Sequence, residues 1–250
     1  MPDRDDRGAA ATRIPRPVDA VDGEPAPWAD VPSEVRGRVA QGTLLAALVA
    51  AGRTLDRRPP DPLNELTGQP TTVAATLRDS AVLIACFEED GEARVVLTRR
   101  ADTLPRHRGE VALPGGRLEP GESPLDAALR EAHEEVGLDP ASVTPAAWLR
   151  PIVTFASSSI IRPYVGTLVE RPALQAHPFE VDRVFDVAIR ELLADGAFHE
   201  ERWRRPSHRA AEGDGRFPIS FFDVGGETVW GATARILREL CCLVCGIEPR

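Results

Sequence analysis

The sequence has 250 residues, a formal net charge of −9 and 30 basic residues, all of which are arginine. Because lysine is absent, a P-loop and Schiff-base chemistry are both excluded. Any permanently charged side-chain cation that contacts a phosphate must then be a guanidinium, which binds oxyanions through paired hydrogen bonds. The acidic balance argues against a nucleic-acid partner. An all-arginine composition is also what a GC-rich genome would produce.

Targeting and redox features favour the cytoplasm. The first ten residues, MPDRDDRGAA, contain no apolar core typical of a signal peptide, and the longest apolar run, Leu44–Ala51, is too short to span a bilayer. We therefore expect a cytoplasmic protein with no membrane partner. Four cysteines are too few for a disulfide scaffold, and the Cys242–Cys245 pair has no second pair to complete a zinc site, so we interpret them as buried thiols.

The chain is predicted to divide at residue 75. Residues 1–75 form an extension that we expect to be largely disordered, because residues 1–32 are rich in Pro, Ala, Asp and Arg without periodic apolar spacing. One helix is expected within it, over 33–52, with Ser33 as a candidate cap. Residues 76–248 form the globular domain.

The globular part begins with a predicted hairpin. Ser80–Phe87 is a continuous apolar run of strand length, Asp90-Gly91 provides a turn, and Ala93–Thr98 is a second run. A short strand is expected at Glu110–Leu113. Further strands are expected at 147–154, 160–170, 181–187, 217–223 and 227–230, helices at 123–136, 189–194 and 232–245, and an exposed basic loop at 200–209. Strands on both sides of one central helix predict a mixed α/β sandwich.

The central helix has clear boundaries and an acidic face. Ser123 is the candidate N-cap and Gly137 the stop. At about 100° per residue, Glu134 and Glu135 fall about 60° and 40° to either side of Glu131, so the three carboxylates share one face. An apolar stripe lies apart from them, while two small residues lie beside the acidic face and are expected to leave room in front of it. The stripe is Leu125, Leu129, Ala132 and Val136, and the small residues are Ala127 and Ala128.

Two interpretations of this acidic face compete. Closely spaced carboxylates raise one another's pKa unless a cation neutralises them, and a set of oxygen ligands alone suits Mg²⁺ or Mn²⁺. Alternatively, the face is simply solvated and supported by helix pairs, since Asp126–Arg130 and Arg130–Glu134 have i,i+4 spacing. The Gly-Gly turn upstream and a further carboxylate, Glu122, favour the metal site.

Eight residues together resemble the Nudix box, a pattern of Gly, five residues, Glu, seven residues and Arg-Glu-apolar-x-Glu-Glu-x-Gly-apolar. They are Gly116, Glu122, Arg130, Glu131, Glu134, Glu135, Gly137 and Leu138. The resemblance implies a Nudix-type α/β/α sandwich with a mixed sheet, and hydrolysis of a nucleoside diphosphate linked to another moiety. Its implied roles are metal binding by Glu131, Glu134 and Glu135 with the Gly116 carbonyl, orientation of Glu131 by Arg130, and support by Glu122. Glu180, in a later segment, is a candidate for an additional ligand or base.

A second resemblance concerns the substrate. Residues 97–116, LTRRADTLPRHRGEVALPGG, are similar to the pattern of coenzyme A pyrophosphatases within the Nudix family, and so are residues 178–185 and 230–237. The chain departs from the pattern at Pro105, where Arg is usual, and at Leu113, where Phe is usual.

The implied reaction converts coenzyme A, or an acyl-CoA, and water into 4′-phosphopantetheine and adenosine 3′,5′-bisphosphate. Candidate substrate-binding residues are Arg100, Arg106, His107 and Arg108, since the 3′-phosphate requires cations. Two alternatives remain open: a Nudix pyrophosphatase for ADP-ribose, NADH or modified nucleoside triphosphates, and a nucleotide-sensing regulator without turnover. The expected partner is a small nucleotide, and a homodimer is left open.

Overall fold

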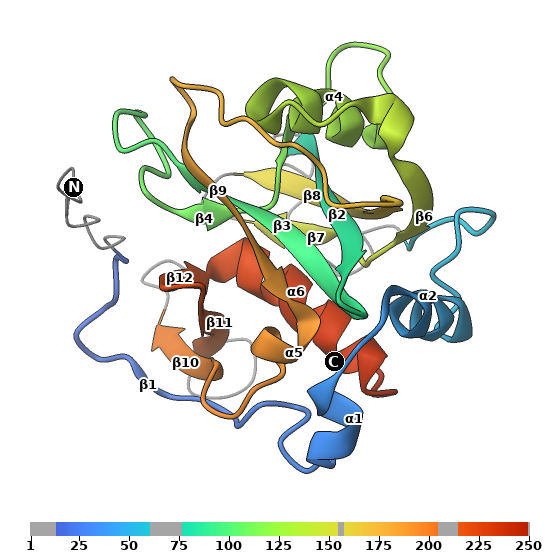
Figure 1. Ribbon diagram of the computed structural model, residues 1–250. Coiled ribbons are helices and arrows are strands. Elements are labelled where there is room, and N and C mark those ends of the chain that lie inside the picture. The colour runs from blue at the N-terminus through green and yellow to red at the C-terminus, as the bar shows by residue number, and fades with distance from the viewer. Residues whose placement is uncertain (1–13, 61–76, 155–157, 205–214, 250) are drawn as a thin grey trace, which may run out of the picture.

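The computed structural model describes residues 14–60, 77–154, 158–204 and 215–249 (Figure 1). The strands are β1 (Val21–Asp22), β2 (Arg78–Glu89), β3 (Glu92–Arg100), β4 (Val111–Ala112), β5 (Gly115–Arg117), β6 (Thr144–Trp148), β7 (Ile152–Thr154), β8 (Ser159–Thr167), β9 (Val181–Ala188), β10 (Phe198–Arg204), β11 (Arg216–Val224) and β12 (Glu227–Trp230). The helices are α1 (Ser33–Gly37), α2 (Gln41–Ala50), α4 (Pro124–Val136), the 3₁₀ turn η2 (Pro140–Ser142), α5 (Ile189–Leu192) and α6 (Gly231–Val244).

The larger sheet is mixed, as predicted. Its strand order is β4-β3-β2-β8-β6, and β5, β7 and β9 pair with β2, β8 and β3 respectively. β2 runs parallel to β8, while the other pairings are antiparallel. The β2–β3 hairpin turns at Asp90 and Gly91, which both have positive φ. The apolar runs of β2 and β3 are continuous because helices cover both faces of this sheet.

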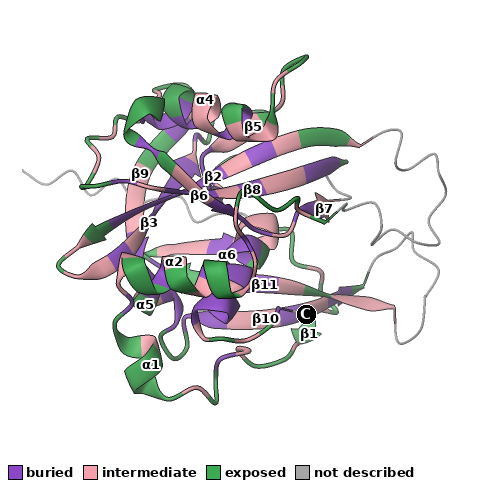
Figure 2. Ribbon diagram, turned by 90° about the vertical axis from the view of Figure 1, so that its right-hand side faces the viewer, coloured by how far each residue is buried: buried purple, intermediate pink, exposed green. Residues whose placement is uncertain are grey.

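Four layers are stacked in the molecule (Figure 2). α4 packs on one face of the larger sheet, α2 and α6 pack on the other, and a second sheet of order β1-β10-β11-β12 lies beyond α6. One apolar cluster lies between α4 and the larger sheet, and another joins α2, α6 and the second sheet. The predicted α/β/α sandwich is therefore confirmed, with an additional layer.

The prediction of a loop over 200–209 is wrong for residues 200–204, the part of this range that the structure describes. Residues 198–204 form β10, paired along its length with β11. The strand has no simple apolar alternation, and its buried Glu201 is accommodated by neighbours: the carboxylate accepts a hydrogen bond from Trp203 Nε1 at 2.7 Å and from Arg16 Nε at 3.0 Å. Trp203 is buried, and residues 205–209 lie outside the described residues.

Much of the expected extension is packed against the domain. Trp28, expected in a disordered stretch, is 1% exposed and lies against Phe198 and Phe222. The helix expected over 33–52 is two helices, since residues 38–40 are extended and the Val39 carbonyl accepts a hydrogen bond from the Ala93 N–H at 2.7 Å. Residues 1–13 and 61–76 are outside the described parts, so the boundary at 75 stays a prediction.

Other boundaries shift by a few residues. The strand expected at 147–154 is divided into β6 and β7 around Pro151, which has no N–H to donate to a ladder. Cys86, Cys241 and Cys242 are buried and Cys245 is partly buried, all as free thiols, as expected.

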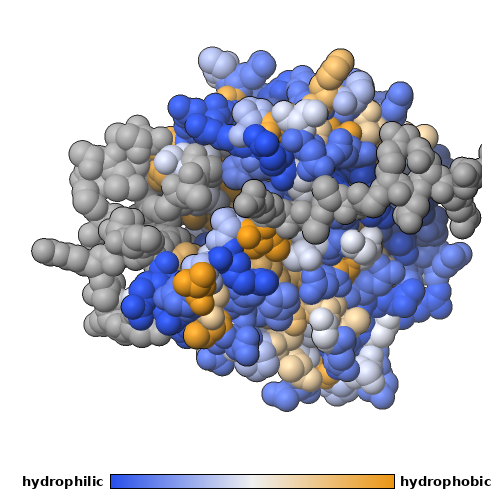
Figure 3. Space-filling model, turned by 90° about the vertical axis from the view of Figure 1, so that its left-hand side faces the viewer, coloured by the Kyte–Doolittle hydropathy of each residue, from blue (hydrophilic) through white to orange (hydrophobic). Residues whose placement is uncertain are grey.

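The surface of the molecule is mostly polar on the side drawn in Figure 3. In the parts of the chain that are described, no helix is both long and apolar enough to cross a membrane. On the side of the molecule drawn in Figure 3, hydrophilic side chains predominate and apolar ones form small, separate patches. Single exposed apolar side chains are ordinary on protein surfaces, so one of them gains meaning only from what lies beside it.

Candidate active site

Helix α4 begins and ends where the sequence predicts. The Ser123 hydroxyl accepts a hydrogen bond from the Asp126 N–H at 3.2 Å, and Gly137 ends the helix in the left-handed region with φ 69°. Asp126 therefore takes part in the cap rather than pairing with Arg130. The short strand β5 precedes the helix and lies beside it, so Gly115 and Gly116 face the carboxylates.

One expectation about the helix faces is wrong. Ala127 and Ala128 leave no room in front of the acidic face, because both are fully buried against the sheet. Small side chains let the helix approach the sheet closely, and this packing carries Glu135 inward as well. Glu135 is 3% exposed, whereas Glu134 lies on the outer face.

Glu135 is held by two donors. Arg100 Nη1 donates to its Oε1 at 3.2 Å, and the Gly115 N–H donates to its Oε2 at 3.1 Å. Burial nevertheless raises the pKa of this carboxyl to about 7, against the lowering effects of the Gly115 N–H and the Arg100 charge. A buried carboxylate whose pKa is raised this far is a candidate functional group.

The two glycines before the helix are required by close contacts. Gly115 has φ 157°, and a Cβ there would collide with the backbone of β2 at Ala81 and Val82. A Cβ on Gly116 would collide with the Glu131 carboxylate. Only glycine lets the backbone pass this close to the carboxylates.

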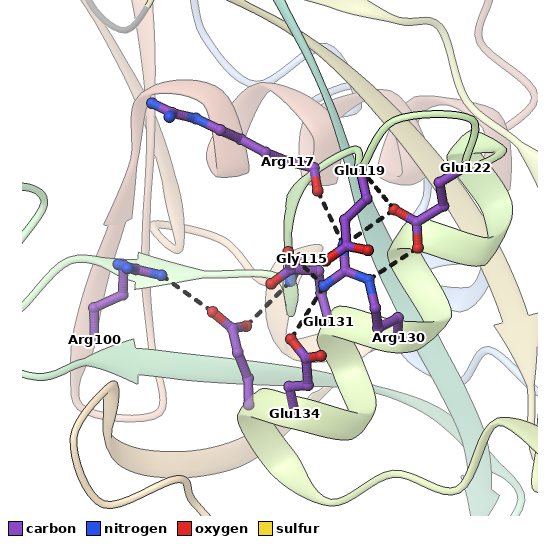
Figure 4. A network of polar contacts seen from close by, with 9 residues as sticks. Arg100, Gly115, Arg117, Glu119, Glu122, Arg130, Glu131 and Glu134 are labelled. Carbon is purple, nitrogen blue, oxygen red and sulfur yellow. Dashed lines mark hydrogen bonds and ion pairs between the residues drawn. The ribbon is translucent and has the colours of Figure 1, made fainter.

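Arg130 is the centre of a polar network (Figure 4). Its Nε and Nη2 donate to the Glu122 carboxylate at 2.9 and 3.1 Å, and Nη2 also donates to the Arg117 carbonyl at 3.0 Å. Its Nη1 donates to Glu131 at 3.0 Å and to Glu134 at 3.1 Å. The hydrogen bonds to Arg130 hold the pKa of Glu122 below its usual range. One guanidinium therefore orders three of the four box carboxylates.

The carboxylate oxygens of α4 are ligands of the chemical type that a divalent cation prefers. Burial raises the pKa of Glu131, against the opposite effect of Arg130, so Glu131 and Glu135 are two crowded carboxylates that a cation would stabilise in their charged form. Among the described residues, however, no three His, Cys, Asp or Glu side chains converge to enclose an ion. The carboxylate oxygens of Glu131 and Glu134 accept hydrogen bonds from Arg130 instead. Those of Glu135 accept from Arg100 and the Gly115 N–H.

The predicted substrate-binding residues divide into two groups. Arg100 lies in the site beside Glu135. Arg106, His107 and Arg108 lie on the exposed loop between β3 and β4, where His107 Nδ1 contacts the Glu110 carboxylate at 2.9 Å and this contact raises the pKa of His107.

An ion-pair network centred on the buried Arg99 side chain supports that loop. Arg99 Nη2 lies 3.5 Å from Asp102 in the loop, and Arg99 Nη1 lies 3.8 Å from Glu227 of β12. The Glu227 carboxylate also forms an ion pair with Arg183 Nη1 at 3.1 Å. The second sheet thus contacts the base of the loop that contains the arginines.

Sequence reasoning missed several groups in the site. The Gly115 N–H and the Arg117 carbonyl are backbone groups, and a sequence motif specifies side chains only. The turn at 177–180 is joined to α4, since the His177 N–H donates to the Glu135 carbonyl at 2.9 Å. The same turn contains Glu180, the candidate from the sequence, whose negative charge contributes to raising the pKa of both Glu131 and Glu135.

Comparison with known proteins identifies the family. A profile of the NUDIX domain matches residues 77–206, which is 130 of the 250 residues. The chain belongs to the Nudix hydrolase family. Nudix hydrolase 22, chloroplastic, of Arabidopsis thaliana is 39% identical over 179 residues, covering 67% of this chain and 55% of the plant protein. The chain therefore spans about half the length of that relative.

Two further Nudix proteins show the range of similarity. The Nudix hydrolase NudL of Yersinia pestis is 35% identical over 184 residues, covering 72% of this chain and 86% of that protein. A solved structure of a MutT/nudix family protein from Enterococcus faecalis aligns with TM-score 0.41 and 16% identity, over 89% of this chain and 73% of that one. The cytoplasmic location and the homodimer both stay predictions.

The raised pKa of Glu135 predicts how stability depends on pH. A group whose folded pKa rises from 4.5 to about 7 contributes stability at low pH that is lost as pH rises through the folded pKa. In metal-free protein, we expect the free energy of unfolding to fall between pH 5 and pH 8, by about 3 kcal/mol from this group. Urea unfolding at both pH values, with EDTA present, measures it. Glu135→Gln should flatten this dependence, and an equally steep one in that variant would contradict the assignment.

Proposed function

We propose that the protein hydrolyses the pyrophosphate bond of coenzyme A, or of an acyl-CoA, with Mg²⁺ or Mn²⁺ as cofactor. The observation that carries the proposal is the site around Gly115-Gly116, where Glu131 and Glu135 crowd together beside Arg100 and the outer carboxylate Glu134. An anionic pyrophosphate repels a nucleophile, so its hydrolysis requires positive charge at the phosphates.

The proposal assigns a role to each charged residue of the site. Glu131, Glu134 and Glu135 would hold the divalent ion, with the Gly116 carbonyl, and the bound ion would screen the phosphates and acidify a water. Arg130 keeps Glu131 and Glu134 on one side of the helix through its Nη1 hydrogen bonds. Glu122 fixes the opposite side of the guanidinium. Arg130 and Glu122 are therefore positioning residues.

The arginine loop supports coenzyme A as the substrate. A 3′-phosphate requires a cation, and Arg106, His107 and Arg108 are exposed on one loop near Arg100. Because Arg100 is paired with the buried Glu135, we assign it to the reacting phosphates and the three loop residues to the 3′-phosphate. The contact with Glu110 favours a protonated, cationic His107.

The alternative substrates are ADP-ribose, NADH and modified nucleoside triphosphates, which share the pyrophosphate but lack the 3′-phosphate of coenzyme A. The departures at Pro105 and Leu113 keep this alternative open. A sensor without turnover is less well supported, because Glu122, Glu131, Glu134 and Glu135 are all present.

A substrate panel tests the proposal. Purified protein with Mn²⁺ or Mg²⁺ should release adenosine 3′,5′-bisphosphate from coenzyme A, detected by chromatography, with a higher kcat/KM than for ADP-ribose, NADH or dephospho-coenzyme A. The last compound is the matched control, since it lacks only the 3′-phosphate. Absence of product with either metal would reject the coenzyme A assignment, and a preference for dephospho-coenzyme A would reject the role of the loop.

A further inference from the structure

The turn at residues 177–180 forms one border of the active site. At its start, the His177 N–H donates to the carbonyl of Glu135 at 2.9 Å, which ties the turn to the end of α4. At its end, the Glu180 carbonyl accepts from the Ala101 N–H at 2.9 Å, which ties it to the residue after Arg100. The turn therefore joins the two chain segments that supply the Arg100–Glu135 ion pair.

Phe179 lies inside this turn, between its two backbone tethers, and directly precedes Glu180. The segment that joins the end of α4 to the end of β3 therefore carries an aromatic residue.

Phe179 is unusually exposed for a phenylalanine. Its side chain is 76% exposed, and its ring meets the ring of His177 edge-on, with centroids 6.0 Å apart and an angle of 60°. His177 is itself partly buried, and its Nδ1 has no hydrogen-bond partner among the described residues. The Phe179 ring is therefore in contact with His177 on one side, while most of its surface faces solvent. A solvent-exposed aromatic costs hydrophobic free energy that a ligand on it would recover.

We propose that Phe179 is a stacking platform for the nucleobase of the substrate. A nucleobase has a flat π-face that gains most from an exposed phenyl ring, and such stacking tolerates any base. The pantetheine arm of coenzyme A is flexible and rich in amides, so it gains less from the same ring.

The inference rests on the proposed function only in part. It requires that the pyrophosphate of the substrate carry a nucleoside, and coenzyme A, ADP-ribose and NADH all contain adenosine in that position. It does not require that coenzyme A be the preferred one of these.

Steady-state kinetics provide the first test. For the adenine-containing substrate with the highest kcat/KM, Phe179→Ala should raise KM roughly 5- to 100-fold, the effect of losing one base–aromatic stack, and should change kcat far less. Phe179→Tyr should restore a low KM. Val169→Ala is the control, because Val169 is 97% exposed and lies near the β8 end of the same connection from β8 to β9. An unchanged KM in Phe179→Ala, or a fall confined to kcat, would overturn the inference.

Calorimetric binding separates the two halves of coenzyme A without turnover. Phe179→Ala should weaken binding of adenosine 3′,5′-bisphosphate by the same factor as KM and leave binding of 4′-phosphopantetheine unchanged. The reverse pattern would assign the ring to the pantetheine arm and reject the nucleobase. If coenzyme A is not cleaved but Phe179→Ala still weakens adenosine 3′,5′-bisphosphate, only the proposed substrate fails. If the unaltered protein binds no adenine nucleotide, both fail.

Discussion

Glu135→Gln is expected to lower kcat by at least roughly 10²-fold, the loss typical when a catalytic carboxylate is removed. Glutamine has nearly the same volume and retains an oxygen that can accept from the Gly115 N–H, so the packing of α4 should be preserved. What it loses is the negative charge beside Arg100. The measurement is steady-state kinetics at saturating Mg²⁺ and Mn²⁺, accompanied by a thermal melt to show that the variant is folded.

Glu119→Gln is the matched control for that experiment. Glu119 is an exposed glutamate in the loop that precedes α4, and it joins the network through its backbone, whose N–H donates to the Glu122 carboxylate at 2.9 Å and whose carbonyl accepts from the Glu122 N–H at 3.1 Å. The same chemical change there should have little effect on kcat. A Glu135→Gln variant with a kcat close to that of the unaltered protein would remove Glu135 from the catalytic machinery.

Arg130→Ala is expected to lower kcat/KM by roughly 10²-fold, because misplacing catalytic groups by about 1 Å costs that much. The guanidinium donates to Glu122, Glu131 and Glu134, so its removal leaves three carboxylates to repel one another. Kinetics over a range of Mn²⁺ concentrations would show the apparent metal affinity falling together with kcat.

Arg130→Lys tests the geometry of this contact separately from its charge. Lysine keeps the positive charge but lacks the planar fork that donates to Glu122 and the Arg117 carbonyl together. Its activity should lie between those of Arg130→Ala and the unaltered protein. Full activity in the lysine variant would mean that the charge alone is sufficient, and full activity in the alanine variant would reject the network altogether.

The parts of the fold predicted from sequence are those encoded locally. The β2–β3 hairpin follows from two apolar runs around Asp90-Gly91, and α4 from Ser123 and Gly137 at its ends. The carboxylates of α4 belong to one face because helix geometry alone places them there. Their approach to Gly116 could be expected from the box spacing.

What the sequence did not predict depends on contacts between distant segments. β10 contains Glu201, Arg202 and Arg204, which look like a loop until Arg16 and β11 supply their partners. Trp28 is isolated in a polar segment, and its burial depends on Phe198 and Phe222, about 170 or more residues away along the chain. The burial of Glu135 depends on how closely the alanines of α4 bring the helix to the sheet. Local periodicity contains none of this information.

The network of Arg99, Asp102 and Glu227 has a consequence for how this enzyme family can diversify. Glu227 belongs to β12, which lies beyond the residues matched by the NUDIX domain profile, yet it reaches the base of the loop with Arg106, His107 and Arg108. The carboxylates proposed for hydrolysis lie on α4, and one of them, Glu135, is held by Arg100, the residue after Arg99. In the proposed assignment, changes in the β11–β12 hairpin would therefore act on the loop that selects the nucleotide, so that selectivity could vary through a strand pair outside the helix that supplies the carboxylates.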